Sequence, residues 1–338
     1  MGPTMHDVAR VAGVSIKTVS NVINDYPYVR SETRSRVQAA IEELDYRPNL
    51  SARGLRSGRT GVIGLAVPAL RENYFAELAD AIIRAAEKRG LGVVVEQTSG
   101  DRETELAAVS GGRQRFMDGL LFSPVALGQQ DAHMLDGPFP LVLLGERIFG
   151  GPTDHVAMHN VSAAEAAVAH LIETGRRRVA LVGAAAPEDD DGEASSANLR
   201  LRGYRRALAV AGIPFDPRLV RPAAGWNRQA GAAALHGLVA DGVTFDAVFA
   251  LNDTLGLGVL RALGEERIAV PAQVAVIGFD DIDEARFSVP SLSSVGTGRE
   301  QIAEIAVEML VERIAEKDER RPPRTIKPDF AIVRRESS

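Results

Sequence analysis

Three apolar stretches of the chain end in polar side chains that suit the recognition of hydroxyl groups. Glu146 follows PLVLLG, Asn252 follows AVFAL, and Asp280 follows VIGF. Carboxylates accept hydrogen bonds, whereas an amide side chain both donates and accepts them. Ligands of open parallel sheets bind beyond the carboxyl ends of the strands. If these stretches are parallel strands, the pattern predicts a site for a small polar ligand.

A second candidate site lies in residues 5–24, where two short helical patterns meet at GVS. Val8, Ala9 and Ala12 form one apolar face, and the same spacing returns after the break. Gly13 allows a tight turn, and Ser15 is expected to cap the second helix by accepting a backbone N–H bond. Two such helices are typical of a helix-turn-helix, whose second helix reads bases in the major groove of DNA.

The free face of this second helix carries side chains that suit DNA. Lys17 can donate to guanine, Asn21 can bond an adenine edge, and Ile16 can touch a thymine methyl group. Small polar side chains suit phosphates. The alternative is a generic helical hairpin in which Ile16 is a hydrophobic staple. The expected DNA contacts here are Ser15, Ile16, Lys17, Thr18, Ser20 and Asn21.

The charge distribution separates the start of the chain from the rest. Residues 1–60 hold nine Lys/Arg and six Asp/Glu, whereas the remaining residues hold 30 and 39. The net charge of −6 is therefore the average of a small basic part and an acidic body. This predicts that only the basic part meets a polyanion.

The elements that position these residues follow from hydrophobic periodicity. SETRSRVQAAIEELDY predicts a third helix, with Ser31 as its cap and Val37, Ala40, Ile41 and Leu44 as its buried stripe. After residue 60, continuous apolar strands alternate with helices, which is typical of parallel sheets covered on both faces. A chain of 338 residues is too long for one core. We expect an α/β protein: a three-helix helix-turn-helix domain plus a two-lobed core with parallel sheets.

Several function classes are disfavoured by composition and motif. The chain has no Cys, which excludes disulfides and cysteine nucleophiles and suits a reducing compartment. Neither a membrane-length apolar run nor a signal-peptide pattern is present, so we expect a cytoplasmic location. There is no P-loop, dinucleotide fingerprint or G-x-S-x-G elbow. His155 and His159 are expected on a strand and need not share a face. We therefore expect no cofactor, no metal and no catalytic residue.

The two segments DVARVAGVSIKTVSNVIN and SETRSRVQAAIEELDYRPNLSARGLRSGRT resemble the DNA-binding head of the lactose-repressor (LacI/GalR) family. The resemblance implies that Ile16, Lys17 and Asn21 read operator bases. In the body, ALNDTLGLGVLRAL, VPAQVAVIGFDDID and PSLSSVG resemble the effector-binding core of that family, which is similar to periplasmic sugar-binding proteins.

The resemblance also implies a set of effector-contacting positions. Trp226 matches an aromatic residue that stacks on a sugar face, although it also suits ordinary core packing. Arg200 on its own also suits an ion pair or a solvated charge. The expected effector residues are Tyr74, Glu146, Ser196, Arg200, Trp226, Asn252 and Asp280. Asp253 is expected to cap the helix that follows it. His159 departs from the family, which usually has an Asp there.

In the segment NLSARGLRSGR, Leu55 is an apolar residue that stands alone among arginines. An apolar wedge in the minor groove explains it. The resemblance likewise implies a hinge helix that folds on DNA, with Arg53 and Leu55 as DNA contacts. The alternative is a linker whose Leu55 packs on the body. Gly54 replaces a residue with a side chain and costs a helix ~1 kcal/mol relative to Ala, so Gly54→Ala should bind operator more tightly.

These observations predict a helix-turn-helix domain over 1–49, a hinge over 50–60 and a core over 61–338. Lobe one is expected at about 61–158 and 290–323, and lobe two at about 159–289 and 324–338. The expected function is that of a homodimeric transcriptional regulator, a repressor, which binds a palindromic operator under control of a small molecule, a sugar. The rivals are a sugar receptor without a DNA role and a sugar-processing α/β enzyme.

Overall fold

The computed structural model describes residues 3–23, 26–46, 59–184, 194–316 and 320–338. The chain divides into two compact units, Met1–Thr60 and Gly61–Ser338. Arg53, Gly54 and Leu55 lie outside the described residues. What the sequence suggests for the hinge therefore stays a prediction.

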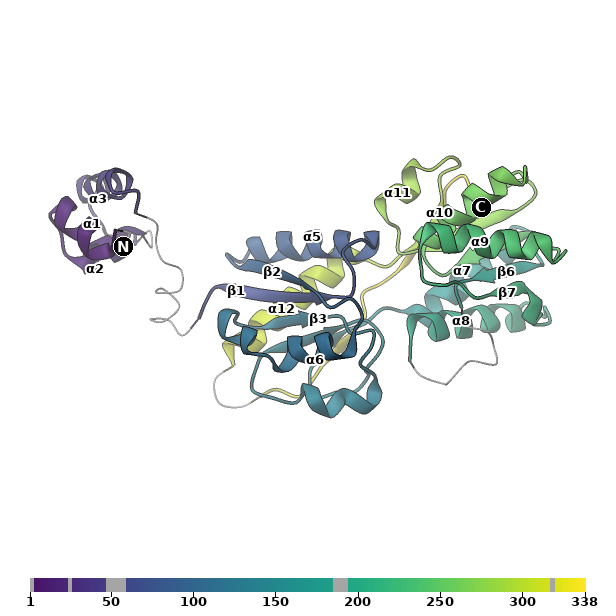
Figure 1. The fold of residues 1–338 in the computed structure, drawn as a ribbon, viewed down its shortest axis with the longest axis horizontal. Coiled ribbons are helices and arrows are strands. Elements are labelled where there is room, and N and C mark those ends of the chain that lie inside the picture. Colours follow the sequence, from purple (N-terminus) through teal and green to yellow (C-terminus); the bar gives the residue numbers. More distant parts are fainter. Residues whose placement is uncertain (1–2, 24–25, 47–58, 185–193, 317–319) are drawn as a thin grey trace. The chain divides into compact units, whose positions relative to one another are not determined.

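The first unit, which we call the head, contains three short helices around one small core (Figure 1). Val8, Val19 and Val37 are fully buried at the centre, one from each helix. Gly13 ends the first helix with φ of +63°, a conformation that favours glycine because it has no Cβ. The helices are α1 (Met5–Ala12), α2 (Ile16–Ile23) and α3 (Ser31–Glu43).

The starts of these helices test two capping predictions. The backbone N–H of Thr18 donates a 3.1 Å hydrogen bond to the Ser15 hydroxyl, so the prediction that Ser15 caps α2 is confirmed. The prediction that Ser31 caps α3 is wrong. Ser31 is itself the first helical residue, and its backbone carbonyl accepts a 3.1 Å hydrogen bond from the hydroxyl of Ser35. Arg30 precedes the helix without a side-chain capping bond.

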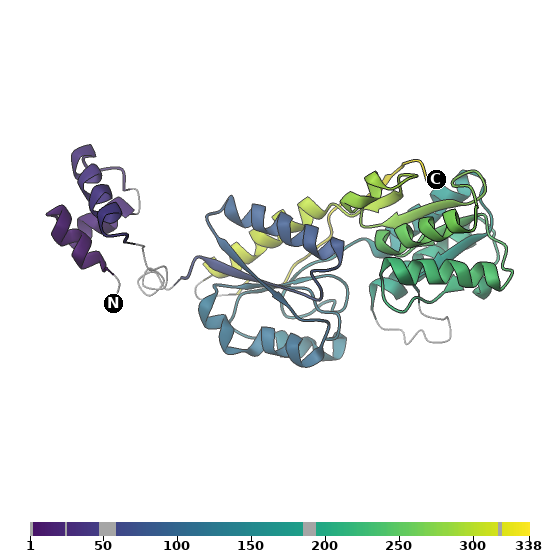
Figure 2. The same ribbon diagram turned by 45° about the horizontal axis from the view of Figure 1, so that its top comes forward.

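The second unit, the body, begins with a six-stranded sheet in the order β11-β5-β4-β3-β1-β2, and all of its pairings are parallel. Helices α5 and α12 cover one face and α6 covers the other (Figures 1 and 2). We call this the first lobe. Its elements are β1 (Val62–Val67), α5 (Asn73–Glu87), β2 (Gly92–Gln97), α6 (Arg102–Ser110), β3 (Leu120–Phe122), β4 (Leu141–Leu144), β5 (Asp154–Val156), α12 (Arg299–Ala315) and β11 (Thr325–Ile326).

Alternation along the strands explains the two covered faces of this sheet. Leu65 and Leu121 pack toward α5 and α12, whereas their neighbours Ala66 and Phe122 pack toward α6. Successive strand residues point to opposite faces, so a strand buried on both faces is apolar throughout. The prediction of parallel sheets covered on both faces is confirmed.

The second lobe contains a six-stranded sheet in the order β12-β10-β9-β8-β6-β7, in which only β12 is antiparallel to its neighbour among the pairings described. Gly231 and Gly258 let α9 and α10 approach closely, because an added Cβ would lie 2.2 Å and 2.0 Å from backbone oxygens of the facing helix. The elements are α7 (Asn160–Glu173), β6 (Val179–Val182), α8 (Ser196–Val210), β7 (Val220–Arg221), α9 (Arg228–Ala240), β8 (Ala247–Ala250), α10 (Asp253–Glu265), β9 (Ala275–Phe279), α11 (Asp283–Phe287), β10 (Ser293–Gly296) and β12 (Ala331–Val333).

The lobe boundaries differ from the sequence-based ones in the last fifty residues. β10 belongs to the second sheet, so the segment assigned to lobe one from 290 begins too early. β11 belongs to the first sheet, so the return to lobe two at 324 is also too early. The chain therefore crosses between lobes after β5, after β10 and after β11. Both strands lack a long apolar run: β10 reads SSVG and β11 has two residues.

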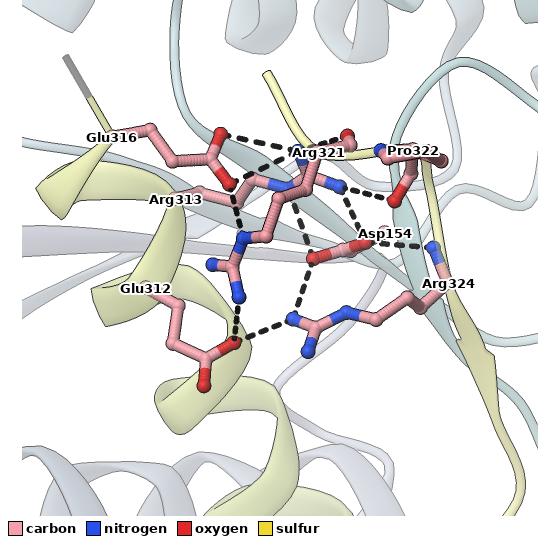
Figure 3. A network of polar contacts seen from close by, with 7 residues as sticks. All are labelled: Asp154, Glu312, Arg313, Glu316, Arg321, Pro322 and Arg324. Atoms are coloured by element: carbon pink, nitrogen blue, oxygen red, sulfur yellow. Dashed lines mark hydrogen bonds and ion pairs between the residues drawn. The ribbon is translucent and has the colours of Figure 1, made fainter. Parts of the chain in front are cut away.

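A network of ionic contacts secures β11 to the first lobe (Figure 3). Asp154, at the start of β5, is completely buried. Its carboxylate accepts hydrogen bonds of 2.7 and 2.9 Å from Arg313 and of 2.8 Å from the backbone N–H of Arg324. Glu312 accepts a further 2.6 Å bond from the side chain of Arg324. The end of α12 and the start of β11 are thereby fixed to the same strand.

Candidate functional site

A cavity of about 360 Å³ lies in the body and is lined from both lobes. The first lobe supplies residues from α5 and from the ends of β3 and β4, and the second lobe supplies residues from α8 and from the ends of β8 and β9. The structure brings all seven predicted effector residues to this cavity: Tyr74, Glu146, Ser196, Arg200, Trp226, Asn252 and Asp280.

Arg200 is held rigidly in the cavity wall and is only 2% exposed. Its Nε donates a 2.7 Å hydrogen bond to Oδ1 of Asn160, and its Nη1 donates to the carbonyl of Leu251. Its guanidinium stacks over Phe279, 3.5 Å from the ring centroid. Burial lowers the pKa of Arg200, although Asp280 acts in the opposite direction. The side chain is an ion-paired structural cation as well as a cavity residue.

Asp280 follows β9 and forms the ion pair with Arg200, at 3.6 Å between Oδ1 and Nη2. Its φ of +106° is unusual for a residue with a side chain and indicates local backbone strain at the site. Burial raises the pKa of Asp280 to about 7, against the opposing effects of Arg200 and Arg299, while Glu146 adds to the rise. Asp280 is therefore a hydrogen-bonding group poised to change protonation near neutral pH.

Glu146 joins the two lobes across the cavity. Its Oε2 accepts a 2.8 Å hydrogen bond from the hydroxyl of Ser196, the first residue of α8. Its Oε1 accepts a 3.3 Å bond from the backbone N–H of Met158, at the crossing between the lobes. Tyr74 approaches from α5 of the first lobe, and burial raises its phenolic pKa, with Asp280 and Glu146 adding to the rise. The tyrosine is therefore a neutral hydroxyl at this site.

Two further residues have one group engaged and another facing the cavity. Asn252 caps α10, because its Oδ1 accepts a 2.8 Å bond from the N–H of Leu255, which leaves Nδ2 as its donor for a ligand. Trp226 donates from Nε1 to the carbonyl of Gly183 at 3.0 Å. The indole is half-buried and packs against the core of the second lobe while lining the cavity. The two roles suggested for Trp226 are thus compatible.

The prediction that Asp253 caps the helix is wrong, because Asn252 does so. Asp253 is instead completely buried behind the cavity wall. It accepts hydrogen bonds of 2.9 Å from the N–H of Ile282 and 2.6 Å from the hydroxyl of Ser294. Burial raises its pKa well above the ordinary value, and the charge of Asp280 adds to this rise. Asp253 therefore fixes the segment after β9, on which Asp280 lies.

Sequence reasoning missed several residues of the cavity. Ser123 follows β3 just as Glu146 follows β4, so the rule of polar residues after strands would have found it. Arg147 donates from Nη1 to the carbonyl of Ala194 in the other lobe at 3.3 Å. Glu72 lies before α5 and lines the cavity, and no sequence signal marks it.

In the head, the candidate DNA contacts lie on α2 and at its start. The side chain of Lys17 is exposed, whereas Thr18, Ser20 and Asn21 are half-buried. Ile16 is also half-buried and packs against the head's core, as the staple alternative requires. An accessible part of its side chain remains, so the base contact stays a prediction.

No helix among the described residues has the length and apolar character needed to cross a membrane. Within the same residues, no group of three or more His, Asp and Glu side chains is arranged to hold a metal ion. His155 contacts the carbonyl of Gly145 through Nε2 at 2.5 Å, whereas His159 lies outside β5 and directly precedes α7. The two histidines do not share a strand.

Comparison with known proteins identifies both units. A model of the lacI family of bacterial regulatory proteins matches residues 4–49, and a model of a periplasmic binding protein-like domain matches residues 168–338. The ribose operon repressor of Escherichia coli (strain K12) is 32% identical over 315 residues, which cover 93% of each chain. The chain belongs to the lacI family. It is a DNA-binding transcriptional regulator whose relatives are repressors rather than enzymes.

Solved structures of lacI-family regulators share this fold. A regulator from Sanguibacter keddieii DSM 10542 is 49% identical, with a TM-score of 0.76, and the match covers 83% of this chain and 99% of that one. A CelR–cellobiose complex is 31% identical, with a TM-score of 0.71 and coverage of 99% and 100%. A lac repressor dimer bound to operator and an anti-inducer is 26% identical, with a TM-score of 0.83 and coverage of 100% and 99%.

Proposed function

We propose that this lacI-family regulator binds a palindromic operator as a homodimer, and that a carbohydrate in the cavity controls its operator affinity. The observation that carries the proposal is the convergence of seven predicted effector residues, from both lobes, on one cavity. A binding site on DNA requires the compartment that holds the chromosome, so the proposed location is the cytoplasm.

Support for the DNA role comes from the head. Its second helix presents Lys17, Thr18 and Asn21, and residues 1–60 have an excess of basic side chains. One small helix-turn-helix domain contacts few base pairs and so gives limited specificity. A dimer with two-fold symmetry doubles the DNA sequence that is contacted. The lac repressor that resembles this chain is a dimer on its operator. We infer the same assembly here, with Arg53 and Leu55 as additional DNA contacts.

Support for a carbohydrate comes from the chemistry of the cavity. Glu146 and Asp280 are acceptors for hydroxyl donors, Asn252 offers an amide donor, and Trp226 offers an aromatic face. Two donors of Arg200 bind Asn160 and Leu251, and its charge is paired with Asp280, so an added anionic group would have to compete with Asp280 for this cation. A ligand with several hydroxyl groups fits these acceptors. The related CelR is described with cellobiose bound.

Control of DNA requires the ligand to bind two arrangements of the lobes unequally. The cavity contains Tyr74 and Glu146 from the first lobe and Arg200 and Asp280 from the second. A sugar held by both groups therefore favours one lobe arrangement over others. We propose that this change is passed to the two hinge segments of the dimer and alters the placement of the heads on the operator.

Trp226 is the only tryptophan of the chain, which makes its fluorescence a direct test. The protein is titrated with cellobiose, D-ribose and a panel of other mono- and oligosaccharides, with nucleosides as controls. A saturable change with one sugar class, lost in Asp280→Ala, supports the proposal. A response to nucleosides alone, or no response to any sugar, contradicts the carbohydrate assignment.

A further inference from the structure

Two segments, one on each lobe, contribute a residue to the lining of the cavity. Each segment also carries a nearby residue that contacts the other segment outside the cavity. On α5 of the first lobe, Tyr74 lines the cavity and Glu77 lies one turn later. After β9 of the second lobe, Asp280 lines the cavity and Asp283 begins α11 three residues later. Residues three apart on a helix share a side, so any shift of α5 moves Tyr74 and Glu77 together.

Glu77 makes a bridge between these two segments. Its Oε1 accepts a 3.0 Å hydrogen bond from the backbone N–H of Asp283, which crosses from lobe to lobe. Its Oε2 lies 2.5 Å from Nη2 of Arg299, the first residue of α12. The side chains of Glu77 and Arg299 are only 23% and 19% exposed. The pair is therefore screened less by solvent than an ion pair on the open surface.

Arg299 extends the bridge to the strained backbone of the cavity. Its Nη1 lies 3.4 Å from the carbonyl oxygens of both Asp280 and Asp281. These two residues have φ of +106° and +52°, which residues with side chains rarely adopt. Such a conformation persists only where its surroundings hold it. Glu77 orients Arg299, and Arg299 binds the segment that carries Asp280.

We propose that Glu77 and Arg299 are positioning residues that set the separation of Tyr74 from Asp280 and, with it, the spacing of the two lobes. Asn73 also contacts Glu284, which is a further contact between α5 of the first lobe and α11 of the second. An effect of losing these contacts on sugar affinity rests on the proposed function. An effect on the spacing of the two lobes does not.

The same two helices supply a matched control. Glu300 of α12 forms a 2.7 Å ion pair with Arg84 of α5, inside the first lobe. Removing this carboxylate also breaks an ion pair between α5 and α12, yet it removes no contact with the second lobe among those described for Glu300. Glu300→Ala therefore reports the effect of losing an α5–α12 ion pair alone.

The chain has no cysteine, so spin labels can be attached at two introduced sites. Glu87→Cys on α5 and Ala240→Cys on α9 are exposed positions, one on each lobe. Pulsed dipolar spectroscopy on the full-length protein then measures the distance between lobes. Glu77→Ala should shift or broaden the distance distribution, Glu77→Gln should do so less because it keeps one acceptor for Asp283, and Glu300→Ala should leave the distribution unchanged.

A distribution for folded Glu77→Ala that matches the parent protein would overturn the proposal, as would an equal change in Glu300→Ala. Thermal unfolding verifies that each variant folds, and Glu77→Gln serves if Glu77→Ala does not. In parallel, Trp226 fluorescence with cellobiose and D-ribose measures affinity, which should change by about fivefold or more in Glu77→Ala if either sugar binds. If neither sugar binds any variant, the choice of effector fails while the distance result still decides the positioning role.

Discussion

The guanidinium of Arg200 lies 3.6 Å from the carboxylate of Asp280, and both side chains are more than nine-tenths buried in the wall of the cavity. This ion pair brings α8 to the end of β9 beside the cavity. Removing one partner of a buried pair is costly because the remaining charge has no compensation. The pair therefore links the stability of the second lobe to the chemistry of the proposed effector site.

Substitution of Arg200 by Met should destabilise the body by about 3 kcal/mol, since Asp280 and Asn160 lose their charged partner. Urea unfolding followed by circular dichroism measures this loss. Arg228→Met removes an exposed ion pair with Glu284 and should cost about 0–1 kcal/mol. Equal losses in the two variants would show that the Arg200–Asp280 pair has no special role.

The pH dependence of stability should contain a component from Asp280. Burial raises its pKa to about 7, whereas the unfolded chain releases this proton near its ordinary value of about 4. The folded state therefore holds the proton between these values, and the contribution of Asp280 is full below about pH 4 and is lost as pH rises through about 7. Unfolding free energies from about pH 5 to about pH 8 should fall more steeply in the parent protein than in Asp280→Asn. If the unfolding free energies of the two proteins changed equally with pH, the raised pKa of Asp280 would be refuted.

Asp154, which lies in the network of Figure 3, should make stability depend on pH in the opposite direction from Asp280. Its burial favours the neutral acid, but hydrogen bonds from Arg313 and Arg324 outweigh this and hold the pKa of Asp154 below its ordinary value. Stability from this group is therefore present above the unfolded pKa and is lost as pH falls through the folded one.

Asp154→Asn should thus cost about 3 kcal/mol at neutral pH and less in acid. Thermal unfolding as a function of pH tests this, with Asp241→Asn, an exposed partner of Arg221, as the control. A loss that stays constant down to acid pH would contradict the electrostatic account of the network.

Lys17→Ala should weaken operator binding, because its exposed side chain at the start of α2 is expected to reach a base edge. The loss should be about 1–3 kcal/mol on the operator and small on unrelated DNA. Fluorescence anisotropy on both duplexes at matched salt measures the ratio. Equal weakening on the two duplexes would instead make Lys17 a phosphate contact.

The sequence predicts elements best where one physical signal dominates. The continuous apolar runs PLVLLG, AVFAL and VIGF correspond to β4, β8 and β9, because strands buried on both faces have no polar positions. β10 and β11 lack this signal, because β10 reads SSVG and β11 has only two residues, neither of which is buried. The lobe boundaries predicted from the sequence therefore lie too early in the chain.

The residues of the site were likewise predictable only where the sequence carries a clear signal. Polar residues directly after strands converge on the cavity, since parallel strands end at one edge of a sheet, and the family resemblance added Arg200 and Trp226. The buried role of Asp253 could not be read from the sequence, because Asn252 and Asp253 are both good capping residues. Only the fold decides that Asp253 meets Ser294, 41 residues away.

The central claim is that a sugar bound in the cavity changes operator affinity. The most direct test is fluorescence anisotropy of the full-length protein on operator DNA, with and without a sugar that saturates the Trp226 signal. This sugar should shift the operator Kd by at least about fivefold, and the shift should disappear in Asp280→Ala. Saturable sugar binding at Trp226 with an unchanged operator Kd would contradict control of DNA binding by the sugar.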